Sequence, residues 1–174
     1  MRHRPFVLIA GLAVMQACCG APGDTGAHHA GEGRASATAR WPLRTLAGET
    51  TTLGAVTGGR AAVVALWATW CDSCRREVPV LRRLHERSQV TGDFVVVAVA
   101  IGDDAREVQA FASRSGVAYR QLLDDEGRFG ELGDRRVPTI LVVDPAGHTV
   151  HEGRALDRPA LDALAQVLAR ARNP

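Results

Sequence analysis

Two uninterrupted apolar runs, at residues 61–67 and 94–101, most constrain what this chain can fold into. Each has the length of one strand, and the second is too rich in β-branched residues to favour a helix. A strand that is apolar at every position needs cover on both faces of its sheet. Between the runs, residues 72–88 carry apolar side chains at helical spacing beside a row of arginines. The order strand, helix, strand predicts an α/β domain.

Shorter elements extend this pattern on both sides. Residues 41–53 predict a β-hairpin with Gly48 in its turn. Asp103 or Asp104 is placed to cap a helix that Gly116 ends. Further along, the chain predicts a weak strand at 119–123, a hairpin from 139–143 and 148–152, and a helix that Asp157 caps. A chain of 174 residues has room for one such domain, which we place at residues 41–174.

The first 17 residues have the pattern of a removable secretory signal. A basic start at residues 2–4 precedes an uncharged run at 6–15, which is too short for a membrane-spanning helix of about 20 residues. Residues 15–18, Met-Gln-Ala-Cys, resemble a bacterial lipobox, in which the cysteine becomes the lipidated first residue. We therefore expect residues 1–17 to be a signal peptide of the lipoprotein type and Cys18 to be the lipidation site. Ordinary cleavage without a lipid is the alternative.

Residues 18–40 are expected to form a flexible linker. Eleven of the 21 residues from 20 to 40 are Ala or Gly, and no apolar periodicity is present. A flexible chain of this length spans about 25 Å, enough to hold a domain clear of a membrane surface. We expect an exported protein on the periplasmic side of a bacterial membrane. The formal net charge of +2 gives no reason to expect a nucleic-acid partner.

Two cysteines three residues apart, Cys71 and Cys74, open the predicted helix directly after an apolar strand. Backbone N–H groups at a helix start carry partial positive charge, which favours a thiolate over a thiol. We expect Cys71, nearer the helix end, to attack a disulfide and Cys74, one turn in, to resolve the mixed disulfide. A zinc site would need further ligands that the domain does not offer at suitable spacing. A structural disulfide across so short a loop would constrain the unfolded chain very little.

The stretch W-A-T-W-C-x-x-C at 67–74, with Pro79 and Val137-Pro138-Thr139, resembles the thioredoxin superfamily. Within it, the chain is similar to the exported, membrane-tethered TlpA/ResA-type thiol:disulfide redoxins over about residues 41–172. The resemblance implies a thioredoxin fold, with a central mixed β-sheet flanked by helices and an N-terminal β-hairpin. It also implies that no cofactor or metal is required.

The resemblance further implies a substrate groove beside the cysteines. In the family, the proline that matches Pro138 is cis and faces the disulfide, where it withholds a donor and opens a strand edge for a substrate chain. An ordinary loop proline is the alternative. Trp70, Val137 and Thr139 are the other residues that we expect at this groove.

The chain departs from thioredoxins at Ala65, where they carry a buried aspartate. Another group must then accept the proton when Cys74 becomes a thiolate. Glu77 is the candidate, because the resembling subfamily has a glutamate three residues after the second cysteine. A partly buried carboxyl suits general acid–base chemistry near neutrality. A solvent-facing glutamate paired with an arginine is the alternative.

The residues between the cysteines bear on the direction of electron flow. Asp72 places a carboxylate beside Cys71, which opposes thiolate formation, and Arg75 and Arg76 offset it in part. We therefore expect a reductant. The resemblance implies that it exchanges disulfides with exported proteins, in cytochrome c maturation or a similar process, and that a membrane electron donor reduces it. A copper chaperone of the Sco type, with the two cysteines as ligands, is the alternative, although Sco proteins use a C-x-x-x-C spacing. A peroxidase is disfavoured, because no Thr-x-x-Cys stretch precedes the helix.

Overall fold

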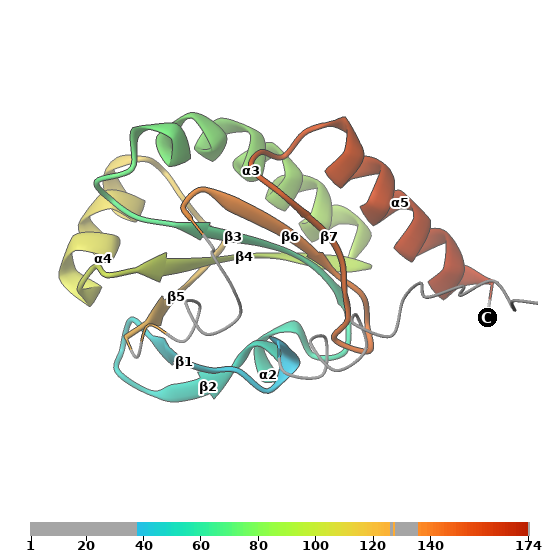
Figure 1. Ribbon diagram of the computed structural model, residues 1–174, viewed down its shortest axis with the longest axis horizontal. Helices are drawn as coiled ribbons and strands as arrows, with labels where there is room; N and C mark the ends of the chain where they lie inside the picture. The colour runs from blue at the N-terminus through green and yellow to red at the C-terminus, as the bar shows by residue number, and fades with distance from the viewer. Residues whose placement is uncertain (1–37, 126, 128–135, 174) are drawn as a thin grey trace, which may run out of the picture.

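The computed structural model describes residues 38–125, 127 and 136–173, which form a seven-stranded sheet with helices packed against it (Figure 1). The predicted signal peptide, Cys18 and residues 18–37 of the predicted linker lie outside the described residues. The strands are β1 Pro42–Thr45, β2 Thr50–Thr52, β3 Ala61–Trp67, β4 Phe94–Ile101, β5 Arg120–Asp124, β6 Thr139–Val143 and β7 Thr149–Gly153. The helices are α2 Leu53–Thr57, α3 Asp72–Thr91, α4 Ala105–Arg114 and α5 Arg158–Arg172.

The sheet is mixed, as predicted, and its strands lie in the order β2-β1-β5-β4-β3-β6-β7. Strands β3, β4 and β5 run parallel, joined by crossovers through α3 and α4. β6 and β7 add to the β3 edge as antiparallel strands, and the hairpin β1–β2 adds to β5. The active-site helix α3 therefore starts at the carboxyl end of the central strand β3 (Figure 1).

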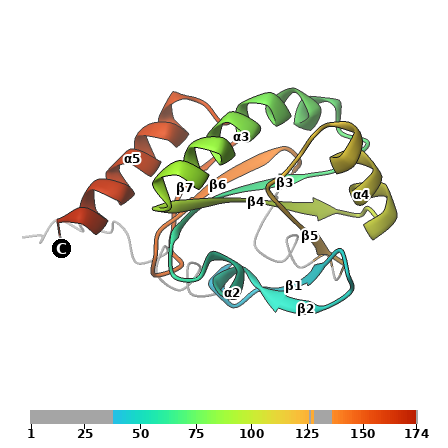
Figure 2. The same cartoon turned by 180° about the vertical axis from the view of Figure 1, so that it is seen from behind.

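Two cores, one on each face of the sheet, explain why β3 and β4 have no polar positions. Alternate residues of β3 enter opposite cores, Ala65 on the side of α3 and Val64 on the other. Helices α3 and α5 lie together over the first face, as the two opposite views show (Figures 1 and 2). Trp41, Leu43 and Leu53, from the N-terminal hairpin and the start of α2, cover the second face.

Most predicted elements are confirmed, with three differences in detail. Helix α3 continues three residues beyond the predicted end at Ser88 and stops at Gly92, whose φ of 71° suits glycine. The short helix α2, capped by the hydroxyl of Thr52, was not anticipated from the sequence. Of the two candidate caps for α4, Asp104 forms a capping box with Glu107, which leaves Asp103 free for another role.

Packing begins before Trp41, where the sequence places the start of the domain. Thr38 is only 2% exposed. Ala39 lies against two glycines: a Cβ on Gly147 would come 2.5 Å from the Cβ of Ala39, and one on Gly54 would come 2.9 Å from its carbonyl oxygen. Side chains at these two glycines would force residue 39 away from the domain. Residues 38–40 therefore belong to the folded unit.

Candidate active site

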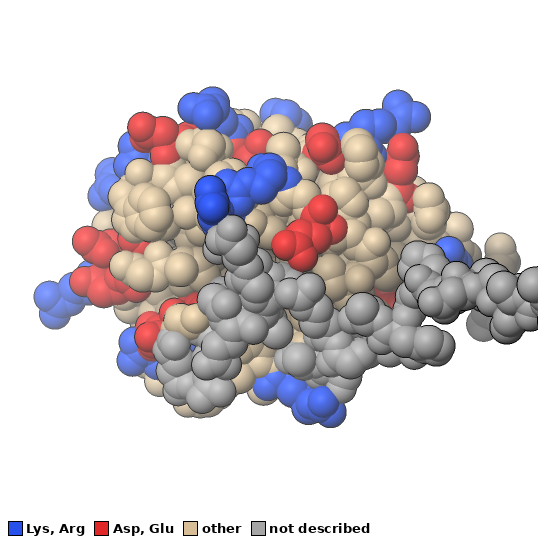
Figure 3. Space-filling model, in the orientation of Figure 1, with Lys and Arg blue, Asp and Glu red and all other residues tan. Residues whose placement is uncertain are grey.

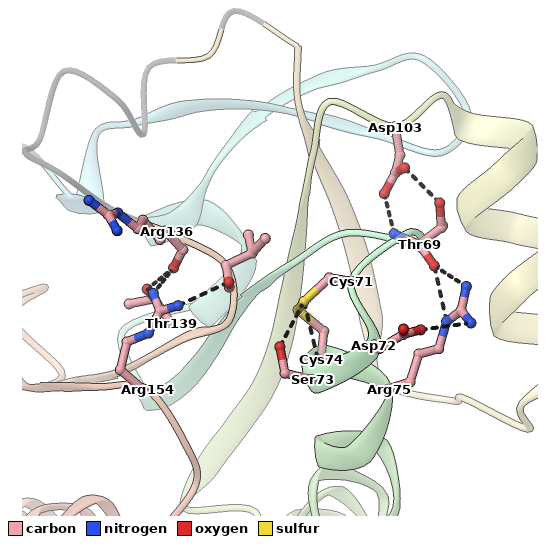
Figure 4. Close-up of a disulfide and its surroundings, with 11 residues drawn as sticks. Thr69, Cys71, Asp72, Ser73, Cys74, Arg75, Asp103, Arg136, Thr139 and Arg154 are labelled. Atoms are coloured by element: carbon pink, nitrogen blue, oxygen red, sulfur yellow. Dashed lines mark hydrogen bonds and ion pairs between the residues drawn. A yellow bond between two sulfur atoms is a disulfide. The ribbon is translucent and has the colours of Figure 1, made fainter.

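Cys71 and Cys74 lie at the start of helix α3 and form a disulfide (Figure 4). Cys71 is the N-cap residue, and its Sγ accepts a hydrogen bond from the backbone N–H of Cys74 at 3.2 Å. The two Cα atoms are 5.3 Å apart, an ordinary distance for a disulfide. The sulfur of Cys71 thus lies where the free N–H groups of a helix start concentrate partial positive charge. The predicted place of the pair is confirmed.

Trp70 is the exposed residue beside this disulfide, as its predicted place at the rim requires. Its side chain is 64% exposed, whereas Cys71 and Cys74 are 6% and 3% exposed. As a residue, Cys71 is thus only slightly more exposed than Cys74 in the oxidised form. The hydroxyl of Ser73 donates to Cys71 Sγ at 3.3 Å, since a disulfide sulfur has no proton to give.

Asp72 carries the negative charge that the sequence places next to Cys71. Its side chain is 82% exposed, and Oδ1 accepts a hydrogen bond from Nη1 of Arg75 at 3.3 Å. Water and a neighbouring guanidinium both weaken the field of this carboxylate at the sulfur. The ion pair with Arg75 is thus present, and the expected effect of Arg75 and Arg76 on the Cys71 thiolate stays a prediction.

Thr69, two residues before Cys71, is held from both sides by contacts that the sequence analysis missed. Its backbone N–H and its hydroxyl each donate to the carboxylate of Asp103 at 2.7 Å, and Asp103 is only 8% exposed. Its carbonyl accepts from Nε and Nη2 of Arg75, at 3.1 and 2.6 Å. The one available signal was the surplus aspartate before α4, where a single cap suffices.

Residues 136–139 lie on the opposite side of the disulfide from Thr69 (Figure 4). The Val137–Pro138 peptide bond is cis, which confirms that prediction. Val137 is half-buried and can be reached from outside, whereas Thr139 is 3% exposed. The hydroxyl of Thr139 donates to the carbonyl of Arg136 at 2.5 Å, so it supports the segment from within.

Arg154 connects this segment to the end of β7. Its Nη1 donates to the carbonyl of Arg136 and, at 3.4 Å, to Oγ1 of Thr139, while its Nη2 donates to the carbonyl of Val137 at 3.0 Å. No sequence motif marks this arginine. Its role depends on the pairing of β6 with β7, which brings Ile140 opposite Gly153.

Glu77 faces inward, as the acid–base prediction requires, and not toward an arginine. The side chain is half-buried, and the backbone N–H of Leu156 donates to its Oε2 at 2.9 Å. Glu77 lines a small cavity of about 10 Å³ together with Cys74, Pro138 and Ala65. The structure therefore brings three predicted site residues to one cavity, and it confirms that the strand beneath them offers no carboxylate at residue 65.

Two further residues line the same cavity: Gln121 on β5 and Tyr119 just before this strand. Burial raises the pKa of the Tyr119 phenol to about 12, although the positive charge of Arg82 acts in the opposite direction. The space behind Cys74 is thus a poor medium for charge.

Two further observations concern metals and membranes. The described residues contain no group of three or more His, Cys, Asp or Glu side chains placed to hold a metal ion. Among the same residues, no helix is long and apolar enough to cross a membrane.

On the face shown in Figure 3, basic and acidic residues of the described part are interspersed.

The sequence pattern of the Redoxin family matches residues 32–168, which is most of the chain and includes the whole site. The chain belongs to the Redoxin family. Its similarity to the ResA-type redoxins is confirmed by relatives that carry the name ResA. The thiol-disulfide oxidoreductase ResA of Geobacillus thermodenitrificans is 29% identical over 90 residues, which make up 51% of each chain.

Other relatives match over a longer part of the chain. The thioredoxin-like protein YneN of Bacillus subtilis is 29% identical over 116 residues, which are 64% of this chain and 66% of YneN. The thiol:disulfide interchange protein DsbE of Pseudomonas fluorescens is 32% identical over 107 residues, which are 60% of this chain and 57% of DsbE. The chain thus spans between about half and two thirds of the length of these relatives.

Solved structures confirm the thioredoxin fold. The structure of MTB DsbF is 26% identical, has a TM-score of 0.61, and the match covers 76% of this chain and 97% of DsbF. A secreted thiol-disulfide isomerase from Corynebacterium glutamicum is 20% identical, with a TM-score of 0.64 and coverage of 75% and 84%. At that identity the second likeness shows the fold alone.

Proposed function

We propose that this redoxin carries out thiol–disulfide exchange with protein partners through Cys71 and Cys74. The observation that carries the proposal is the disulfide at the start of α3, with the sulfur of Cys71 at the N-cap and accepting the Cys74 N–H. Donors and partial positive charge around one sulfur stabilise its thiolate, which is the reactive form. Cys71 is therefore the attacking residue.

In the reducing direction, the thiolate of Cys71 attacks a substrate disulfide, forms a mixed disulfide and releases one substrate thiolate. Cys74 loses its proton and attacks the sulfur of Cys71, which releases the second substrate thiolate. Two electrons have then passed to the substrate, and the Cys71–Cys74 disulfide is left behind. A membrane dithiol donor returns the pair to the reduced state. The carboxylate of Asp72 next to Cys71 favours a reductant, because it opposes the Cys71 thiolate, and its exposure and its pairing with Arg75 make this effect small.

The substrate chain is proposed to lie between Trp70 and the residues before β6. Trp70 is exposed and Val137 is half-buried, so both can contact a partner. Pro138 lines the cavity behind Cys74. Thr139 is buried and supports this wall without reaching the substrate.

Trapping tests the exchange reaction. Cys74→Ser leaves the attacking thiol without a resolving partner. In cells that export the protein, this variant should therefore accumulate mixed disulfides through Cys71. The double variant Cys71→Ser/Cys74→Ser is the matched control and should trap nothing. Trapped cytochrome c precursors would support the cytochrome role. Equal trapping by both variants, or stoichiometric copper binding by a reduced protein that cannot reduce insulin, would overturn the proposal in favour of a metal-handling protein.

Glu77 is proposed to accept the proton of Cys74. It lines the same cavity, and no carboxylate is present at Ala65. Glu77→Gln keeps the acceptor for the Leu156 N–H but cannot titrate. We expect insulin reduction to slow by about 10²-fold near neutral pH when proton transfer limits the rate. Glu86→Gln, on the exposed part of the same helix, is the control. Overlapping pH–rate profiles for wild type and Glu77→Gln would remove Glu77 from the reaction.

We also propose export and lipid anchoring at Cys18, with residues 19–37 as a tether. The support is the basic start, the short apolar run and the lipobox-like Met15–Cys18 sequence. Cys18→Ala should abolish both globomycin-sensitive processing and membrane attachment. Cys19→Ala, at the adjacent cysteine, should change neither. A wild-type protein that is freely soluble after export would contradict the anchor.

A further inference from the structure

The connection between β7 and α5, residues 154–157, touches both walls of the active site. At its first residue, the guanidinium of Arg154 donates to the carbonyls of Arg136 and Val137. Two residues later, the backbone N–H of Leu156 donates to Oε2 of Glu77. One short segment thus contacts the residues before Pro138 and the helix that carries Cys74.

We propose that Arg154 is a positioning residue for substrate docking, which sets the distance of the Val137–Pro138 wall from the cysteines. The inference rests on the proposed exchange reaction. It assigns to an arginine outside the Cys-x-x-Cys stretch the task of holding the surface on which a substrate chain lies.

The geometry favours arginine over any other cation. The guanidinium meets three acceptors in a single fork, namely the carbonyls of Arg136 and Val137 and Oγ1 of Thr139. Its planar donors are fixed relative to one another, so occupying two carbonyls at once also fixes the orientation of the peptide between them. An ammonium group is a point charge and cannot fix that orientation in the same way.

The contacts of Arg154 also decide which backbone groups stay available to a substrate. The Val137 carbonyl is already an acceptor for Nη2, at 3.0 Å. Because the side chain of Arg154 is exposed, it lies at the surface where a partner would approach and not within the core. Loss of the side chain would free the Val137 carbonyl and remove one donor from the Arg136 carbonyl, and the wall would lose its link to the end of β7.

The expected consequence is selective for large substrates. A protein disulfide must lie along the wall to react, so its reduction depends on where Val137 stands. A small aromatic disulfide such as DTNB needs only the sulfur of Cys71. Arg154→Ala should therefore raise KM for insulin about threefold to tenfold, the range that loss of one or two hydrogen bonds produces, with DTNB reduction unchanged.

Two further variants separate positioning from charge and from folding. Arg158→Ala removes a nearby exposed arginine that pairs only with Asp162 on α5, and it should leave both substrates unaffected. Arg154→Lys restores the charge without the fork and should recover the insulin KM only in part. Thermal unfolding of each variant shows whether the domain is intact.

The outcomes are distinct from failure of the exchange reaction. If wild type reduces neither insulin nor DTNB, the proposed function fails. If wild type reduces both and Arg154→Ala matches Arg158→Ala with insulin, the positioning role is wrong. Equal losses with insulin and DTNB would also overturn it, because they would indicate damage at the cysteines. Full recovery by Arg154→Lys would show that charge alone acts.

Discussion

Both segments that flank the disulfide have a carbonyl held by an exposed arginine, and the Thr69 segment in addition donates to a buried carboxylate (Figure 4). The N–H and the hydroxyl of Thr69, before Cys71, both donate hydrogen bonds to the buried carboxylate of Asp103. The carbonyl of Val137, before Pro138, accepts a hydrogen bond from the exposed guanidinium of Arg154. A buried acceptor with two short bonds cannot be replaced by water, whereas carbonyls at the surface can be hydrated. We therefore expect the cysteine side to determine stability and the proline side to tune substrate docking.

The largest effect should follow from removing the buried acceptor. Asp103→Ala leaves the N–H and the hydroxyl of Thr69 without their partner, which should lower the free energy of unfolding by about 3 kcal/mol. Urea unfolding measures the loss. Asp104→Ala is the matched control, because the loss of this neighbouring aspartate removes only a helix cap worth about 1 kcal/mol. Equal losses of unfolding free energy in the two variants would contradict the claim that the Thr69 side determines stability.

A matched pair of threonines gives a smaller and sharper test. Thr69→Val leaves a carboxylate oxygen of Asp103 without its donor and should cost about 2 kcal/mol, since bonds to charged groups are the stronger ones. Thr139→Val removes a bond to the neutral carbonyl of Arg136, which still has Arg154, and should cost about 1 kcal/mol. The same unfolding measurement applies. A larger loss of unfolding free energy for Thr139→Val than for Thr69→Val would contradict the expectation that the Thr69 side contributes more to stability.

The smallest effect is expected only at alkaline pH, at Tyr119 in the cavity that Cys74 and Pro138 line. Burial raises the pKa of this phenol to about 12, so the folded state holds its proton more tightly than the unfolded state does. The stability is thus fully present below the unfolded value of about 10 and declines as the pH rises toward 12. Tyr119 is the one tyrosine of the chain, so tyrosinate absorbance follows it alone.

The same titration distinguishes the two segments. If the Thr69 side seals the cavity, Asp103→Ala should lower the pKa of Tyr119 toward its ordinary value, because water then reaches the phenol. Thr139→Val should leave the titration midpoint where it is. A midpoint near 10 in the wild type would show that the cavity is already wet.

Much of the fold could be predicted from sequence because its signals are local. The apolar runs became β3 and β4, and the helical spacing after Cys71 became α3. Helix α2 was missed because five residues carry too little periodicity to recognise. The burial of Thr38 and the contacts of Ala39 with Gly54 and Gly147 have no signal in the sequence, because the folded chain brings these glycines close to Ala39.

The sequence by itself determined the chemistry at the helix start. Cys71 and Cys74 are three residues apart, and that spacing brings their sulfurs together on one helical turn whatever surrounds it. The same holds for the aspartate caps of α4 and α5, whose acceptors lie three residues from their donors.

Tertiary structure alone decided which groups support that chemistry. Thr69 and Asp103 are 34 residues apart, and Glu77 and Leu156 are 79 apart. Arg154 meets Val137 across 17 residues, and only the pairing of β7 with β6 brings them together. Spacing in the chain carries no information about such contacts, because they depend on strand register and on how α3 and α5 pack over the sheet.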